Sequence, residues 1–259
     1  MQTTDSILKT QQLSYQKKDK LILDKINIAI PNGKISALIG PNGSGKSTLL
    51  KLLVGLNHPT SGEVYLQNQP LSQYKRNEIA KKIAFLPQRS MIPDQFSVFD
   101  LLKAGRFPHQ GIMQRLNQHD HKIINWALDV TEMSEYKDQY VSRLSGGLQQ
   151  RAWLAMVLSQ EAPLIVLDEP ATYLDIKHQI QLLKLIKTLN QIHHKTILWV
   201  VHDLNHAFQI SDYCFVLKEG NLILEGKTET LASNKKLSEA FEIDIKLTEQ
   251  HGQKLLLFS

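Results

Sequence analysis

The chain has 259 residues, enough for one large domain or two small ones, and its hydrophobic fraction of 42% is ordinary for a globular protein. We find no apolar stretch long enough to cross a membrane, and the first ten residues lack the apolar core of a secretory signal. A net charge of +5 suits polyanionic ligands or an anionic surface, but it is too small to indicate a nucleic-acid-binding protein.

The first part of the chain has the pattern of short strands separated by turns. A strong turn signal, Pro31-Asn32-Gly33, follows the first strand. A helix is expected over Ser47–Val54, closed by Gly55. The expected strands are Leu21–Ile30, Ile35–Ile39, Val64–Leu66 and Ile83–Leu86.

The middle of the chain is helical in pattern, and strands and helices alternate again after it. Helical spacing of apolar residues predicts helices over Phe99–Ala104, Ile123–Val130 and Leu148–Leu158. Beyond them we expect a strand at Leu164–Leu167, a helix at Ile176–Ile192, a strand at Ile197–Val201, and a hairpin of Cys214–Leu217 with Leu222–Leu224. Alternation at both ends predicts an α/β core with largely parallel strands, and the helical middle predicts an inserted subdomain.

The single cysteine, Cys214, excludes an internal disulfide framework and fits a reducing compartment. It lies in the apolar run Tyr213–Leu217. We therefore expect a buried, unreactive thiol.

A glycine-rich loop follows the strand Ile35–Ile39 and opens a helix, which is the setting that a phosphate-binding loop requires. Its backbone amides can form an anion-binding nest, and the helix start adds partial positive charge. Lys46 is expected to reach the β- and γ-phosphates of a nucleotide, and the Ser47 hydroxyl to bind Mg²⁺. The residues of the loop are Gly40, Pro41, Asn42, Gly43, Ser44, Gly45, Lys46, Ser47 and Thr48.

Two carboxylates end the apolar strand Leu164–Leu167. Such a strand carries Asp168 to the carboxyl edge of the sheet, where ligands of α/β proteins bind. We expect Asp168 to bind Mg²⁺ through water and Glu169 to polarise the attacking water. Together with the phosphate loop, the pair indicates an NTPase.

The stretch Leu144-Ser145-Gly146-Gly147, which precedes Asp168, resembles the signature motif of the ABC ATPases. The resemblance implies a P-loop NTPase core with an antiparallel β N-terminal part and an inserted helical subdomain. It implies a single ABC nucleotide-binding domain over residues 1–259, with its core at about 1–88 and 161–259 and the helical subdomain at about 89–160. Ser145 is a good N-cap, and the helix it starts would point its positive end at a phosphate. In the family that phosphate belongs to ATP held by the opposite subunit, which implies a head-to-tail homodimer.

The remaining family motifs follow in the expected order. Gln88 resembles the Q-loop glutamine, which senses Mg²⁺ and contacts the transporter partner, and His202 resembles the switch histidine near the γ-phosphate. Tyr173-Leu174-Asp175 resembles the D-loop, which places Asp175 with Ser145, Gly146 and Gly147 at the partner's ATP. Tyr15 is placed like the aromatic residue that stacks on adenine. The resemblance thus implies that the catalytic residues are Glu169, His202 and Gln88. It implies that the residues that bind Mg²⁺ are Ser47, Gln88 and Asp168.

One position departs from the family pattern. Leu148 stands where the family usually has glutamine, and Gln149 and Gln150 come next. The loss of one hydrogen bond would cost about 1 kcal/mol, or about fivefold in binding. We expect an active ATPase with a weaker closed dimer.

Several longer stretches resemble the ATPases of iron–siderophore importers. They are Gly105–His109, Gln150–Met156, Thr172–Ile176 and His202–Asn205. Haem and cobalamin importers are close relatives of that group. The implied partners are a second copy of the chain, an integral-membrane permease and, indirectly, a substrate-binding protein, with the chain peripheral on the cytoplasmic face of the membrane. We expect the permease to dock on the residues just after Gln88 and on Phe99–His109.

Three other classes of ABC protein fit less well. Those acting on DNA carry long coiled-coil or zinc-hook insertions, and this chain has neither a heptad run nor a cysteine pair. ABC translation factors need two such units in one chain. Exporter ATPases usually carry membrane helices in the same chain. An importer subunit that does not bind nucleic acid is the expectation that remains.

Overall fold

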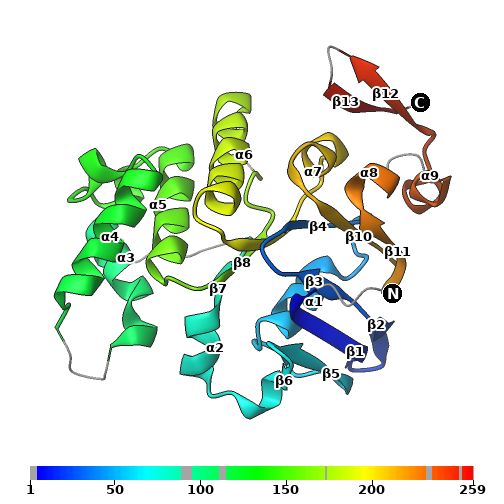
Figure 1. Cartoon of the computed structure of the whole chain (residues 1–259), viewed down its shortest axis with the longest axis horizontal. Helices are drawn as coiled ribbons and strands as arrows, with labels where there is room; N and C mark the ends of the chain where they lie inside the picture. Colours follow the sequence, from blue (N-terminus) through cyan, green and yellow to red (C-terminus); the bar gives the residue numbers. More distant parts are fainter. Residues whose placement is uncertain are drawn as a thin grey trace.

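The computed structural model describes residues 5–88, 95–110, 115–172, 174–231, 235–250 and 253–258, and Figure 1 shows their arrangement. A mostly parallel sheet runs through the centre of the molecule, in the spatial order β11-β10-β4-β9-β8-β7. Among its described strands only β11 runs antiparallel to its neighbour. The carboxyl ends of the other strands therefore meet at one edge. The strands are β4 (Ile35–Ile39), β7 (Ile83–Leu86), β8 (Leu164–Asp168), β9 (Thr196–Val200), β10 (Tyr213–Lys218) and β11 (Asn221–Lys227).

A second, antiparallel sheet lies below the central one in Figure 1. Its longest strand was not predicted, because register shifts along this strand break the alternation of buried and exposed residues. Its strands are β1 (Ser6–Lys17), β2 (Lys20–Ile26), β3 (Ala29–Pro31), β5 (Ser61–Leu66) and β6 (Gln69–Pro70).

The single strand predicted over Leu21–Ile30 is wrong in one respect, since it is divided into β2 and β3. The buried Thr10 hydroxyl donates to the carbonyl of Ile26 and accepts from the amide of Ile28. A side chain thus replaces the backbone partner at this point, and the two halves pair with different parts of β1.

Helices cover both faces of the central sheet. The helix α1 packs with the antiparallel sheet against one face, where Leu38, Val166 and Leu198 point. Ile79 of α2 packs in the same apolar cluster as α1, and the helices of the helical subdomain with α6 and α7 contribute to the cluster on the opposite face, where Ala37 and Ile165 point. The helices are α1 (Lys46–Leu53), α2 (Arg76–Lys82), α3 (Val98–Gly105), α4 (Gln118–Val130), α5 (Gly146–Ser159), α6 (Ile176–Gln191), α7 (Leu204–Ile210), α8 (Thr228–Leu231) and α9 (Lys235–Phe241), with 3-10 turns η1 (Leu71–Gln73), η2 (Phe107–His109), η3 (Ser134–Tyr136) and η4 (Val141–Arg143).

The helices α3, α4 and α5 gather at the left of Figure 1, between β7 and β8 in the chain. They confirm the helices expected in the middle of the chain. The short helices α2 and α7 and the terminal hairpin of β12 (Ile245–Gln250) and β13 (Gln253–Phe258) were not predicted. No helix in the described part of the chain is long and apolar enough to cross a membrane.

Candidate active site

The phosphate loop connects β4 to α1, as the sequence predicts. Two of its glycines are required by the geometry. A Cβ at Gly40 would lie 2.0 Å from the Leu217 carbonyl oxygen, and Gly45 has φ +103° with Leu23 Cδ2 2.8 Å from a built Cβ. A loop that follows this path can be made only where these side chains are absent.

The Lys46 ammonium is buried and curls back over the loop. It donates to the carbonyls of Gly40 and Pro41, each at 2.9 Å. Burial lowers the pKa of Lys46, while the negative charges of Glu169 and Asp168 oppose that effect. The Ser44 hydroxyl is buried in the same loop without a hydrogen-bond partner. A buried cation and an unpartnered donor both suit a loop that receives phosphate.

The two residues expected to hold Mg²⁺ are in contact. The Ser47 hydroxyl donates to Asp168 Oδ1 at 3.1 Å, and the Asp168 side chain is buried at the end of β8. Burial raises the pKa of Asp168, the Ser47 hydrogen bond lowers it, and the charge of Glu169 raises it further. A hydroxyl and a buried carboxylate at one point are hard oxygen ligands of the kind Mg²⁺ takes. The residues present therefore fit the metal.

Glu169 is held between the ends of two other strands. Gln88 Nε2 donates to Glu169 Oε2 at 2.6 Å, and His202 Nε2 lies 2.6 Å from Glu169 Oε1. Gln88 follows β7 and His202 follows β9, on either side of β8 in the sheet. The structure thus brings the three residues predicted to be catalytic together through one hydrogen bond and one ion-pair contact.

A fourth member of this group was missed. The Thr172 hydroxyl lies 3.3 Å from Glu169 Oε2 and shares that oxygen with Gln88. Thr172 opens the family-like stretch Thr172–Ile176, and its position three residues after Glu169 in a turn is the signal that could have found it.

Tyr15 lies on β1 opposite Leu23, and Leu23 contacts the phosphate loop at Gly45. The ring is partly buried against the core. An aromatic residue at this position can meet the base of a nucleotide whose phosphates occupy the loop.

The signature residues begin α5, in the helical subdomain. Ser145 has the N-cap position, but its side chain makes no capping hydrogen bond, so the prediction that it caps the helix is wrong for the hydroxyl. Leu148 packs partly against the apolar core. Gln149 does not replace the missing glutamine, because its side-chain amide (Nε2) donates to the Leu144 carbonyl.

Asp175 begins α6 and caps it by accepting from the His178 amide. Tyr173, the first residue of the predicted D-loop, lies outside the described residues, as do residues 89–94, which follow Gln88.

The model of the ABC transporter family matches residues 23–172, which is more than half of the chain and includes the phosphate loop, the signature stretch and Glu169. The chain belongs to the ABC transporter family. As an ABC ATPase it binds and hydrolyses ATP. It is 44% identical over 240 residues to the iron(3+)-hydroxamate import ATP-binding protein FhuC of Bacillus subtilis strain 168. The aligned region covers 93% of this chain and 89% of FhuC.

Solved ABC proteins share the whole fold. A transporter described as of the metal-chelate type, in an inward-facing conformation, superposes with a TM-score of 0.84 at 26% identity, covering 98% of this chain and 97% of that chain. A dimeric ABC transporter cassette superposes with a TM-score of 0.75 at 29% identity, covering 85% of this chain and 98% of that chain. The predicted ABC fold is confirmed.

Proposed function

We propose that this ABC ATPase powers an importer of iron(III)–siderophore complexes and acts as a homodimer on the cytoplasmic face of the membrane. The observation that carries the cargo is the 44% identity to FhuC, whose alignment runs through 93% of the chain. The active site itself does not select a cargo, because an ATPase subunit does not touch the transported compound.

The group around Glu169 carries the hydrolytic part of the proposal. Glu169 is the base that polarises the attacking water, and Gln88 and His202 fix the direction of its carboxylate. Lys46 balances the charge of the phosphates. Ser47 and Asp168 hold Mg²⁺, which when bound screens the phosphate oxygens.

The site is completed by a second copy of the chain. Ser145, Gly146 and Gly147 lie at the start of α5, where a helix N-terminus attracts an anion, and the Ser145 hydroxyl is not used in capping. Asp175 lies at the start of α6. We assign these residues to the nucleotide of the opposite subunit, and the likeness to a dimeric cassette supports this assembly.

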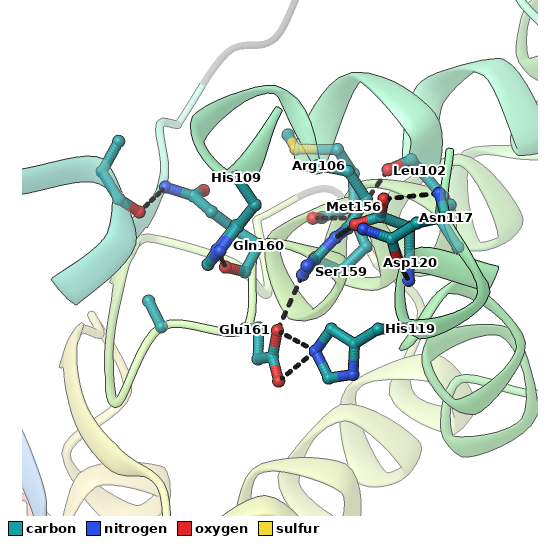
Figure 2. Close-up of polar contacts among 12 residues, drawn as sticks. Leu102, Arg106, His109, Asn117, His119, Asp120, Met156, Ser159, Gln160 and Glu161 are labelled. Atoms are coloured by element: carbon teal, nitrogen blue, oxygen red, sulfur yellow. Dashed lines mark hydrogen bonds and ion pairs between the residues drawn. The ribbon is translucent and has the colours of Figure 1, made fainter. Parts of the chain in front are cut away.

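The permease docks, in this proposal, on the residues after Gln88 and on the segment Phe99–His109. Figure 2 shows how that segment is fixed: Arg106 reaches Asp120, the Ser159 carbonyl and Glu161, and His109 bonds to the Gln160 carbonyl. Phe107, between these two anchors, is 69% exposed. Among the exposed side chains of the segment, Phe107 is the large apolar one, which makes it the best candidate for an apolar contact with the permease.

Two residues of the expected docking segment Phe99–His109 are poorly accessible in the structure. Leu102 is completely buried in α3, so it cannot line a docking groove, and Phe99 is partly covered by His121 and Lys137. Phe107 takes their place in the proposal.

Uptake by cells tests the cargo. A strain lacking this chain, complemented with the wild type or with Glu169→Gln, is supplied with radiolabelled ferric hydroxamate, haem or cobalamin. We expect only the wild type to restore uptake of the ferric hydroxamate. Restored uptake of haem or cobalamin alone would assign the chain to one of those importers.

A further inference from the structure

His178, in the first turn of α6, lies between two segments that the proposed function assigns to the partner's nucleotide. On one side is Asp175, which precedes α6, and on the other is Gly147, in the first turn of α5. The two segments belong to different parts of the fold, since α5 ends the helical subdomain and α6 packs on the central sheet.

The contact with Asp175 fixes the ring. Asp175 Oδ1 accepts the His178 amide at 2.9 Å and lies 2.7 Å from His178 Nδ1. The imidazole therefore cannot turn without breaking a bond to the residue that caps its own helix. The D-loop backbone is held in a second place, where the Gln179 side-chain amide (Nε2) donates to the Leu174 carbonyl.

The opposite edge of the ring packs directly on the signature glycine. A Cβ built on Gly147 would lie 2.6 Å from His178 Cδ2 and 2.8 Å from Nε2, closer than real carbon contacts. Gly147 thus has a second reason to be glycine besides the approach of a phosphate, because the imidazole occupies the space of its side chain.

Among the residues that the structure describes, few other contacts join α5 to α6 near this point. A cavity of about 170 Å³ separates the two helices, lined by Leu154, Leu182 and Leu185 as well as by His178 and Gly147. One turn further along, Arg151 of α5 donates to Gln181 of α6. Because apolar packing is incomplete here, the relative position of the two helix starts depends on these side-chain contacts.

We infer that His178 is a positioning residue for ATP hydrolysis: it fixes the signature stretch of one subunit relative to Asp175 of the same subunit, so that both reach the partner's nucleotide together. His178 itself contacts neither nucleotide in this assignment. The inference rests on the proposed function, which gives Gly147 and Asp175 their place in the shared site.

The first experiment separates positioning from nucleotide binding. In His178→Ala we expect kcat for ATP hydrolysis to fall roughly tenfold or more, since small misplacements of a reacting group cost that much. Binding of a fluorescent ATP analogue to the monomer and the melting temperature should stay at wild-type values, because the phosphate loop is untouched. In a Glu169→Gln background, His178→Ala should raise the ATP concentration needed for dimers in size-exclusion chromatography. Lys187→Ala, on the same helix α6, is the matched control and should leave all of these measurements unchanged.

The second experiment tests the contact itself with a double-mutant cycle. Gly147→Ala places a methyl group where the imidazole lies, so it should reduce kcat. We expect the Gly147→Ala, His178→Ala double variant to lose less than the product of the two single losses, because the methyl group then enters vacated space. Strictly multiplicative losses would overturn the inference.

A variant of the signature stretch distinguishes this inference from the proposed function. Ser145→Arg places a bulky cation at the start of α5 and should stop hydrolysis while the monomer still binds ATP. If Ser145→Arg hydrolyses ATP normally, the shared site is wrong and the role of His178 is wrong with it. If Ser145→Arg is inactive but His178→Ala keeps the wild-type kcat and dimerisation, only the role of His178 is wrong.

Discussion

Glu169 has a left-handed backbone conformation, with φ of 53°, immediately after β8. A non-glycine residue held in this way typically costs about 1–3 kcal/mol and persists only where its surroundings fix it. Here the fixing contacts are Gln88, His202 and Thr172. The two adjacent acids contact different partners, since Asp168 accepts from Ser47 while Glu169 contacts these three residues.

Replacing Glu169 by glutamine should separate ATP binding from hydrolysis. Glu169→Gln keeps the size of the side chain but loses the carboxylate that polarises water, so hydrolysis should fall by about 10² or more. Phosphate release measures the rate, and size-exclusion chromatography with ATP should show a stable dimer. A variant that hydrolyses ATP at the wild-type rate would remove Glu169 from the role of base.

Lys46→Ala should abolish nucleotide binding, because it removes the buried cation of the phosphate loop. Titration with a fluorescent ATP analogue measures the affinity, and circular dichroism checks the fold. Lys51→Ala, in the exposed part of the same helix α1, is the control and should bind normally. Unchanged affinity in folded Lys46→Ala would contradict the assignment of the loop.

At the scale of the elements, Arg106 joins three helix ends. Its guanidinium, only 1% exposed, pairs with Asp120 at the start of α4, with the Ser159 carbonyl at the end of α5, and with Glu161 just beyond (Figure 2). Burial alone would raise the pKa values of Asp120 and Glu161. Hydrogen bonds from Asn117 and Arg106 nevertheless hold the pKa of Asp120 below its ordinary value, and hydrogen bonds with His119 and Arg106 do the same for Glu161.

This cluster makes the helical subdomain sensitive to acid. Both carboxyl groups have a lower pKa in the folded chain than in the unfolded chain, so the unfolded chain binds more protons as the pH falls. Their stabilising effect is complete above the ordinary carboxyl pKa of about 4 and is lost below it. Glu161→Gln removes one of the two carboxyl groups. As the pH is lowered from neutral to about 3.5, the urea concentration at the unfolding midpoint should therefore fall less steeply for this variant than for the wild type. Equal slopes would show that the ion pairs do not contribute.

The sequence predicts the core elements well, because each buried strand of the parallel sheet is a short apolar run. It also places Gln88, Asp168, Glu169 and His202, since each directly follows such a run. It does not predict β1, whose alternation is broken by register shifts, or the division at Thr10, which depends on a side chain distant in the sequence.

Contacts between distant segments are the part of the site that the sequence cannot supply. The bond between Gln88 and Glu169 spans 81 positions in the chain. The packing of His178 on Gly147 likewise depends on how α5 and α6 come together. Such pairs follow from strand order and helix packing, which local patterns do not determine.

At the scale of the whole molecule, the proposed docking segment and the active site are connected through a series of hydrogen bonds. Arg106 and His109 bind Ser159, Gln160 and Glu161, and that stretch leads directly into β8, which ends at Asp168. The Gln160 side-chain amide also donates to the carbonyl of Ala80 in α2 and to that of Ile83, the first residue of β7, whose other end leads to Gln88. Hydrogen bonds therefore link the proposed docking segment to the stretches that lead into β8, which precedes Glu169, and into β7, which precedes Gln88.

Cross-linking in membranes tests the docking segment. Phe107→Cys, treated with a thiol–amine cross-linker in membranes that contain the permease, should give a cross-linked product identified by mass spectrometry. The exposed side chain on η2 lies in the proposed interface, whereas Lys184→Cys on α6 should give none. Cross-links from Lys184→Cys alone would place the permease on the other side of the molecule.

Cys214 lies in β10 beside Ala37 of the central strand β4 and is completely buried, and burial raises the pKa of its thiol. Because the sequence has one cysteine, an alkylating reagent can modify the native chain only when the central sheet opens. The rate of alkylation, measured by mass spectrometry, therefore reports how often the nucleotide-binding core opens. We expect ATP to lower this rate in the wild type and to leave it unchanged in Lys46→Ala, because a ligand protects only the form that binds it.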